Sequence, residues 1–440
     1  LNAGGLLLGN AGALGSGNLT VGGAASLDTS GAFNLANNIV VNGGGSLNLV
    51  GTNALTLNGA LSGAGNLVKN GAGTLTLGGA NTLTGNVSIA GGALALGAGG
   101  SLSPTAAISL TAGTSLDLTA AANQTVGSLS GLGGTVSLGT RTLALGGLGN
   151  TSFAGNFTGT TGGLVKVGTG VQTLSGSNSL TGGFALNGGG LLLGNNGALG
   201  TGVLSVGGEV TLDGTTAALT LANDITLGAG GSLALQGGQP VVLNGVISGV
   251  GNIGKNGASL LTLNGANTFS GGLVVNGGGL LLGNSSALGT GLLDINNAAT
   301  LDTSSALTLG NDVIIGAAGS LNVLGGNALT LGGAISGGGG LIKSGASTLT
   351  LNGANTFTGG LNVAAGTVAL GSGGSLAATG AVSLSGAGAA LDLSLGGNQT
   401  IGALSGVAGS TVALGGNTLT FGSAADQVFA FAPVLFVGVR

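Results

Sequence analysis

Short alternating apolar segments, such as Leu-Thr-Leu at 75–77, Val-Ser-Ile at 87–89 and Leu-Ala-Leu at 94–96, recur at short intervals along this chain. Gly, Asn and Ser fill the gaps between them. Alternation over so few residues indicates strands with one buried face, and the gaps indicate turns. Helix is disfavoured because an interior Gly costs about 1 kcal/mol relative to Ala, and Gly interrupts every window of helical length.

Strands this short need neighbours on both sides, because their backbone groups must find hydrogen-bond partners. Stacked coils supply those neighbours, and three short strands with three turns use roughly 20–24 residues per coil. We therefore predict an all-β fold, a right-handed parallel β-helix (β-solenoid) that forms one elongated rod of about 20 coils. The alternative is an antiparallel sandwich or barrel. It would need longer strands and aromatic core residues, whereas the chain has 10 Phe and no Trp or Tyr.

A near-verbatim repeat runs through the chain. Residues 63–85 read GAGNLVKNGAGTLTLGGANTLTG, residues 251–271 and 339–359 are close copies, and residues 162–182 are a looser one. The copies share a lysine, at Lys69, Lys166, Lys255 and Lys343, with separations of 97, 89 and 88 residues. The large repeat is thus about 90 residues long, which predicts about four coils per repeat.

Two kinds of segment, A and B, lie between these copies in the order A, B, A, A, B. We predict a β-helix repeat array over residues 1–422. Its segments are A at 1–83, B at 84–181, A at 182–270, A at 271–358 and B at 359–422. Residues 423–440 form an atypical apolar tail or cap. The array breaks off in mid-repeat near Phe421, so we expect a capping strand, a truncation or an out-of-frame end.

The composition excludes several classes of function. Charged residues make up 4% of the chain and the net charge is −4, so there is no basic patch of the kind that binds nucleic acid. The absence of Cys and His excludes disulfides, Ser-His-Asp and Cys-His catalytic sites and the commonest zinc sites. No apolar run reaches the roughly 18 residues of a transmembrane helix. We expect no enzyme activity, no catalytic, cofactor-binding or metal-binding residues, no cofactor and no membrane span.

The acidic residues recur with the repeats. Equivalent positions are occupied by Asp28, Asp213 and Asp302, by Asp117 and Asp392, and by Asp224 and Asp312. A functional interpretation would be a carboxylate pair for glycoside cleavage or a calcium site. Equivalents about four coils apart would lie roughly 20 Å apart, too far to act together. We therefore expect turn or strand-end residues copied by duplication.

The repeat lysines and asparagines also allow two interpretations. The four lysines could bind an anionic surface, but we expect each to project from a strand end into solvent, where it discourages aggregation. Asn81, Asn267 and Asn355 are expected to cap turn backbone in left-handed or Asx-turn conformations.

The motif G-x-G-x-L-x-K-x-G-x-G-T-L-T-L-x-G-x-N-T-[FL]-[ST]-G resembles the autotransporter-associated β-strand repeat of type V secreted passenger domains. The resemblance is strongest at 63–85, 251–271 and 339–359. The strands between these copies follow a similar pattern, so the resemblance extends over nearly the whole chain. It implies a right-handed β-helix on, or released from, the surface of a Gram-negative bacterium. Such proteins normally end in a translocating β-barrel, so a barrel anchor downstream is expected.

Three functions compete at this point. The first is a non-enzymatic secreted or surface-displayed scaffold or stalk that supports adhesion or biofilm, located extracellularly or on the outer membrane. The second is a self-associating filament or cell–cell aggregation protein. The third is a polysaccharide-acting enzyme, which the lack of Trp, Tyr and His disfavours. The expected partners are a second copy of the chain or host and cell-surface ligands, and not nucleic acid.

Overall fold

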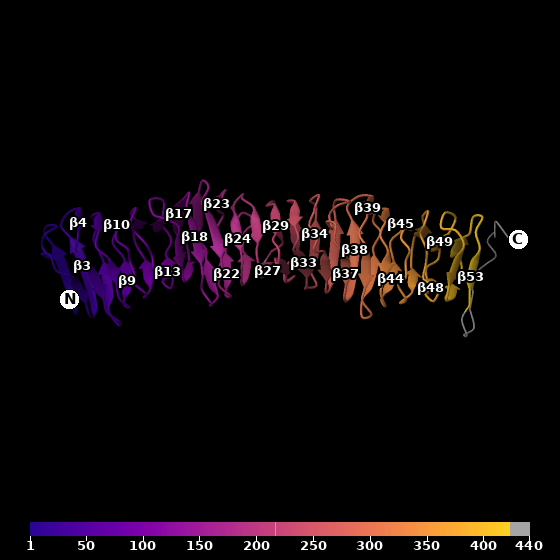
Figure 1. The fold of residues 1–440 in the computed structure, drawn as a ribbon, viewed down its shortest axis with the longest axis horizontal. Helices are drawn as coiled ribbons and strands as arrows, with labels where there is room; N and C mark the ends of the chain where they lie inside the picture. Colours follow the sequence, from indigo (N-terminus) through magenta and orange to yellow (C-terminus); the bar gives the residue numbers. More distant parts are fainter. Residues whose placement is uncertain (216, 423–440) are drawn as a thin grey trace. The chain divides into compact units, whose positions relative to one another are not determined.

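The chain folds entirely into short parallel strands in the part that the structure describes. The computed structural model describes residues 1–215 and 217–422, in which strands of two to six residues alternate with turns and no helix occurs. The chain divides into two compact units, Leu1–Thr216 and Ala217–Arg440. Together they comprise about 20 turns of β-solenoid, so the predicted all-β parallel coil and its number of turns are confirmed (Figure 1).

Each coil of the first unit adds one strand to each of up to three sides. The first side consists of β1 (Gly4–Leu8), β3 (Ala24–Thr29), β6 (Ser46–Leu49), β9 (Asn66–Lys69), β11 (Val87–Ile89), β13 (Ala107–Leu110), β16 (Ser128–Gly131), β19 (Thr151–Phe153), β22 (Val171–Leu174), β25 (Gly190–Leu193) and β27 (Glu209–Gly214). The second side consists of β4 (Phe33–Leu35), β7 (Leu55–Leu57), β10 (Thr74–Leu77), β12 (Ala93–Leu96), β14 (Ser115–Asp117), β17 (Thr135–Gly139), β20 (Asn156–Gly159) and β23 (Ser179–Leu180). The third side has two shorter sheets, one of β2 (Leu19–Val21), β5 (Ile39–Val41) and β8 (Leu61–Ser62), and one of β15 (Gln124–Val126), β18 (Thr142–Leu145), β21 (Gly163–Lys166), β24 (Phe184–Leu186) and β26 (Leu204–Val206).

The second unit repeats this arrangement. One side consists of β30 (Ser232–Leu235), β33 (Asn252–Lys255), β35 (Leu273–Val275), β37 (Leu293–Ile295), β40 (Val313–Ile315) and β43 (Ile335–Ser336). The next consists of β28 (Leu219–Leu221), β31 (Val241–Leu243), β34 (Leu260–Leu263), β36 (Gly278–Leu282), β38 (Ala298–Thr303), β41 (Ser320–Val323), β44 (Gly340–Lys343), β46 (Leu361–Val363), β48 (Ala381–Leu384) and β51 (Ala403–Gly406). The remaining strands are the pair β29 (Ile225–Leu227) and β32 (Ile247–Gly249), the sheet of β39 (Leu307–Leu309), β42 (Leu329–Leu331), β45 (Thr348–Leu351), β47 (Thr367–Leu370), β49 (Ala390–Asp392) and β52 (Thr411–Ala413), and the pair β50 (Gln399–Ile401) and β53 (Leu419–Phe421).

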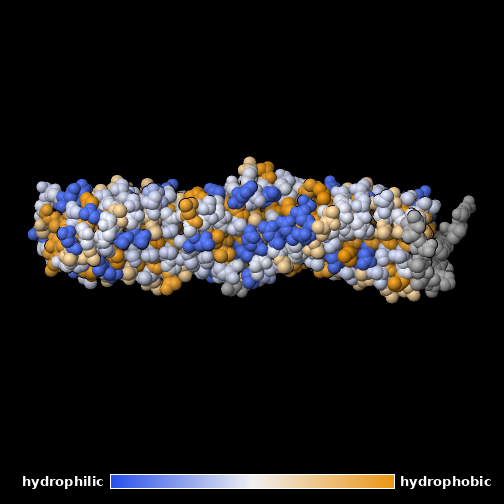
Figure 2. Space-filling model, turned by 90° about the horizontal axis from the view of Figure 1, so that it is seen from below, coloured by the Kyte–Doolittle hydropathy of each residue, from blue (hydrophilic) through white to orange (hydrophobic). Residues whose placement is uncertain are grey.

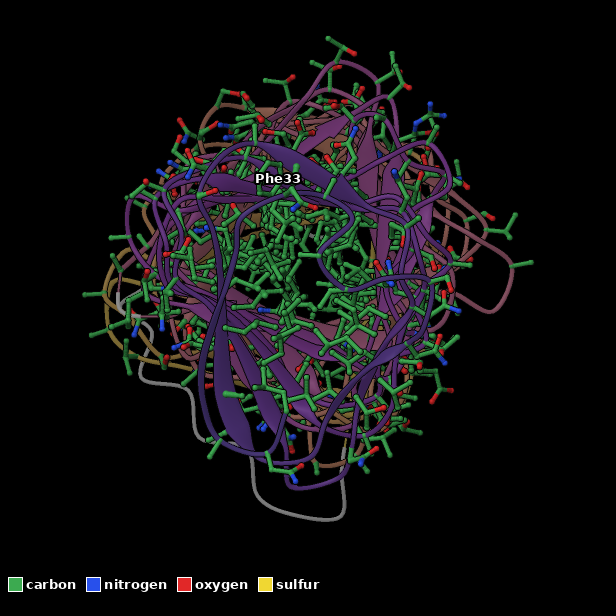
Figure 3. All side chains as sticks on the ribbon, turned by 90° about the vertical axis from the view of Figure 1, so that its left-hand side faces the viewer. Phe33 is labelled. Atoms are coloured by element: carbon green, nitrogen blue, oxygen red, sulfur yellow. The ribbon has the colours of Figure 1, made fainter. Side chains whose placement is uncertain are left out.

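Every second side chain of these strands points inward and stacks on its equivalent in the next coil. In the first unit, for example, Leu27 pairs in register with Leu49, and Leu49 pairs with Lys69. The two leucines are almost fully buried. Figure 3 looks along the coils and shows side-chain carbon filling the interior, with Phe33 labelled at its edge. The dry aliphatic core that the alternation predicts is therefore present.

Coil length varies little. Thr74 pairs with Ala93, nineteen residues on, and Val368 pairs with Leu391, twenty-three residues on. The coil length predicted from the sequence is close to this range. Glycine closes one recurrent tight turn after β8, β32 and β43. At Gly249, for example, φ is +103° and an added Cβ would lie 2.0 Å from the Leu227 carbonyl oxygen. No residue with a side chain fits there without moving the neighbouring coil.

The large repeat is not a whole number of coils, which corrects the expectation of about four. In the second unit, four successive coils connect Gly254 through Val274, Asp294 and Ile314 to Ser336. The repeat equivalent of Gly254 is Ile342, six residues further along, on β44 in the neighbouring sheet. This repeat therefore spans about four and a third coils, because each coil has three sides. The longer step from Lys69 on β9 to Lys166 on β21 in the first unit crosses four coils and two further sides.

Several expectations are untested by this fold. The boundaries between segments A and B stay predictions, and the proposed tail at 423–440 lies outside the described residues. Within residues 1–215 and 217–422, no helix is long and apolar enough to cross a membrane. On the face shown in Figure 2, hydrophobic and hydrophilic residues are interspersed over both units.

Candidate functional site: buried repeat lysines and asparagines

The four repeat lysines are buried, so the prediction that they project into solvent was wrong. Lys69 and Lys166 are each 3% exposed, and Lys255 and Lys343 are 1% and 0% exposed. The physical reason lies in the strand period. Leu67 and Lys69 are two residues apart on β9, so both side chains point to the same, inward face.

Each lysine ammonium caps the turn that follows its own strand. In all four copies, Nζ donates to the carbonyl of the glycine two residues later, at Gly71, Gly168, Gly257 and Gly345. Lys69 also donates to Gly91 O at 3.1 Å, and Lys255 donates to Gly277 O at 3.2 Å. Those second acceptors belong to the next coil. The long lysine side chain thus supplies N–H donors to carbonyls in the turns, which lie beyond the ends of the hydrogen-bonded strands.

Burial shifts the pKa of these lysine side chains. Removal from water lowers the pKa of Lys69, Lys166 and Lys343, because the charged form loses hydration. Near Lys343 the Asp302 carboxylate acts in the opposite direction and raises the pKa of the lysine. Lys166 lacks such a partner at the equivalent place. Lys166 stacks on Leu145, and Leu145 stacks on Val126. Val126 thus corresponds to Leu301 in the Lys343 stack, but the residue after Val126 is Gly127, whereas the residue after Leu301 is Asp302.

A buried asparagine twelve residues after each lysine ties three coils together. Its Oδ1 accepts a backbone N–H of the preceding coil, and its Nδ2 donates to a carbonyl of the following coil. Asn267 accepts from Ile247 N at 2.7 Å and donates to Ala287 O at 2.6 Å. The equivalents are Asn81, between Leu61 N and Ser101 O, Asn178, between Phe157 N and Ala198 O, and Asn355, between Ile335 N and Ser375 O. These asparagines therefore bridge coils, whereas the sequence suggested local turn caps.

Two glutamines extend these bridges and were missed at the level of sequence. Gln124 Oε1 accepts from Leu102 N at 2.9 Å, and Gln399 Oε1 accepts from Leu376 N at 3.1 Å. Both glutamines are almost fully buried. The signal was present in the Asn-Gln-Thr triplet that both B segments share, at Asn123 and Asn398.

The repeated aspartates accept hydrogen bonds from backbone N–H groups at strand ends and turns. Equivalent residues make equivalent bonds. Asp28 and Asp302 accept from the next residue, Asp117 and Asp392 from the second residue along, and Asp224 and Asp312 from a residue of the next coil. Asp213 accepts from Gly214 N at 2.8 Å. These contacts agree with the interpretation of the aspartates as turn and strand-end residues.

The repeat lysines, asparagines and aspartates all form structural bonds to backbone groups. Across residues 1–215 and 217–422, no group of three or more His, Cys, Asp or Glu side chains is placed to hold a metal ion. The recurring lysines and bridging asparagines point inward, and their polar atoms bond to backbone of their own or adjacent coils. What the duplication copies is the internal bonding of the stack.

Four stretches of the chain match the model of a known repeat family, described as the passenger-associated-transport-repeat, at residues 67–96, 164–193, 254–282 and 341–370. Each stretch starts on or beside the strand of a repeat lysine and includes one nineteen-residue coil, for example from Thr74 to Ala93 or from Thr348 to Thr367. The looser copy, with Lys166, is among the four. No curated protein and no solved structure matches the chain significantly. Four passenger-associated-transport repeats set in a parallel β-solenoid are consistent with an autotransporter passenger domain with repeats.

Proposed function

We propose that the chain is a non-enzymatic scaffold or stalk, displayed on the surface of a Gram-negative bacterium or released from it, that supports adhesion or biofilm formation. One observation carries this proposal. The four repeat lysines and the four bridging asparagines use their polar atoms for bonds inside the stack. A repeat that used its lysines for catalysis or receptor binding would be expected to expose them instead.

The proposal predicts that removing a repeat shortens the folded stack and leaves its fold unchanged. Deletion of residues 255–342 joins Gly254 to Lys343 and removes one repeat in phase. With a coil rise of about 4.8 Å, four and a third coils correspond to about 21 Å. The deletion should leave the β-type circular dichroism spectrum and the cooperativity of unfolding intact while shortening the particle in small-angle scattering.

The functional arm of the test uses beads or cells that display the full and the shortened chain with the same terminal adhesive tag. Shortening should reduce capture of a recessed ligand and leave capture of an exposed ligand unchanged. A matched control deletes only positions 255–341, which joins Gly254 to Ile342 and shifts the following repeat by one residue. Because a one-residue shift turns inward side chains outward, this deletion should disturb folding. Turnover of any member of a polysaccharide panel by the purified chain would refute the non-enzymatic role.

Self-association is a second candidate, and a specific surface feature favours it. On three successive coils Asn276 Nδ2 donates to Asn256 Oδ1 at 2.8 Å, and Asn296 Nδ2 donates to Asn276 Oδ1 at 2.9 Å. Uncharged asparagine ladders on stacked strands also occur where β-structures of separate chains pack together. Sedimentation velocity should then show larger species as concentration rises, and Asn276→Lys should suppress them. A strict monomer at high micromolar concentration would exclude this candidate.

A further inference from the structure

A lysine and an aspartate lie close together at an internal corner of the second unit. Leu301 pairs in register with Val323, and Val323 pairs with Lys343. Asp302, next to Leu301, therefore lies two coils before Lys343. Its Oδ1 accepts from Thr303 N at 2.9 Å and from Gly326 N at 3.1 Å. Lys343 Nζ lies beside Gly325, the neighbour of Gly326, which places the ammonium close to the carboxylate.

Thr303 completes this corner and carries an unpartnered group. The residue is 4% exposed, and its Oγ1 is shielded from solvent without a hydrogen-bond partner in the protein. Its backbone is well bonded, because Thr303 O accepts from Asn327 Nδ2 at 2.6 Å. A buried hydroxyl without a partner costs about 1–3 kcal/mol. We call Asp302, Thr303, Asn327 and Lys343 the Asp302 corner.

The first unit contains the same corner, built from Asp28, Thr29, Asn53 and Lys69. Asn53 Nδ2 donates to Thr29 O at 2.7 Å, as Asn327 does to Thr303. All four residues line one small cavity of about 20 Å³. A cavity of at least about 10–15 Å³ holds one water molecule when two to four polar partners surround it. The Asp28 corner meets both conditions.

We propose that each of these two corners binds one water molecule, which bridges the lysine ammonium, the aspartate carboxylate and the threonine hydroxyl. The ammonium has three N–H donors. At Lys69 two of them go to Gly71 O and Gly91 O, so the third is available for the water oxygen. The water then donates to the carboxylate and to Thr Oγ1. A metal cation is disfavoured at this position because the lysine charge would repel it.

The sequence places an aspartate at the same offset before Lys69 and before Lys343, but none at that offset before Lys166. Asp28 precedes Lys69 by 41 residues and Asp302 precedes Lys343 by 41 residues, which is two coils. At Lys166 the corresponding position is Gly127, so no carboxylate is available there. The Lys166 corner is therefore a control within the same chain, and no bridging water is expected in it.

A high-resolution crystal structure of the unmodified chain tests the proposal directly. We expect one ordered water about 2.7–3.2 Å from Thr303 Oγ1 and from an Asp302 oxygen, the usual hydrogen-bond range, and its equivalent at Thr29. Thr303 Oγ1 bonded directly to a protein group, an empty corner, or a cation detected by anomalous scattering after a rubidium soak would each overturn it.

A pair of isosteric variants supplies an independent measurement. Thr303→Val keeps shape and β propensity but removes the hydroxyl. If the hydroxyl binds the water, the unfolding equilibrium constant should rise about 5- to 10-fold, the equivalent of one net hydrogen bond. The control is Thr350→Val, at an outward position of β45, which should have little effect. A Thr303→Val chain as stable as, or more stable than, the parent would count against the bridge, because removing an unpartnered hydroxyl is stabilising.

Discussion

Asn267→Ala should destabilise one region of the second unit strongly and selectively. Asn267 is 2% exposed and bonds Ile247 N in the preceding coil and Ala287 O in the following coil. Truncation leaves both backbone groups buried without partners. Each such group costs about 1–3 kcal/mol, so we expect a loss of about 3 kcal/mol, the low side of the sum because the coils can relax.

The matched control is Asn264→Ala, three residues earlier in the same coil. Asn264 is exposed, and its amide donates only to the Asn244 side chain at 2.8 Å. Loss of one solvent-exposed bond should change stability by less than about 0.5 kcal/mol. The two variants remove the same side chain from the same coil, so their difference isolates the buried bridge.

Hydrogen exchange is the appropriate assay, because repeat stacks need not unfold in two states. The amide of Ile247 loses its acceptor in Asn267→Ala and should exchange about 100-fold faster, the equivalent of nearly 3 kcal/mol. Exchange in the first unit should be unchanged. The bridging role would be refuted if Ile247 stayed as protected as in the parent chain, or if Asn264→Ala were equally destabilising.

Further perturbations test the lysines and the tight turn. Because burial depresses the pKa of Lys69 in the folded chain, its favourable contribution is complete above the unfolded pKa of about 10.5 and is lost as pH falls through the folded pKa. Stability against denaturant should therefore rise as the pH approaches that unfolded pKa from below, and less so in Lys69→Met; a flat profile would contradict this. Lys343→Met should cost about 1–3 kcal/mol more than Lys166→Met, since only the former leaves an aspartate without its cation, and equal thermal shifts would exclude that pairing. Gly249→Ala should destabilise by more than about 1 kcal/mol, whereas Gly310→Ala, where an added Cβ meets no atom within 4 Å, should not; similar melting temperatures for the two would refute the steric argument.

Much of the fold could be read from the sequence because strand alternation and coil stacking are local properties. The triplets Leu-Thr-Leu and Val-Ser-Ile became strands β10 and β11 as expected. The inward direction of Lys69 could also have been read, since it lies two residues from Leu67. The charge of lysine argued for solvent, and tertiary bonding to Gly71 and Gly91 overrode that argument.

The polar contacts between coils could not be predicted in the same way, because they depend on coil length to within one residue. The link between Asp302 and Lys343 follows only once the lengths of the two coils between them are known, and the register of β38, β41 and β44 supplies those lengths. An error of one residue in either coil would turn one of these side chains to the opposite face. The sequence shows that both residues recur, but not that they meet.

The non-integral repeat constrains how a chain of this kind can lengthen. Lys255 lies on β33 in the sheet with β30 and β35, whereas Lys343 lies on β44 in the sheet with β41 and β46. One added repeat thus carries equivalent residues from one side of the coil to the next. The internal interactions are unaffected by this step, because they involve only coils that are one or two apart. A surface site made of equivalent residues would be divided among different sides. Duplication in steps that are not a whole number of coils therefore preserves the bonds inside the stack and distributes equivalent surface residues over different sides, which is the behaviour expected of a scaffold. If instead equivalent exposed positions, such as Asn264 and Asn352, proved necessary for binding one rigid planar ligand at the same time, this reasoning would fail.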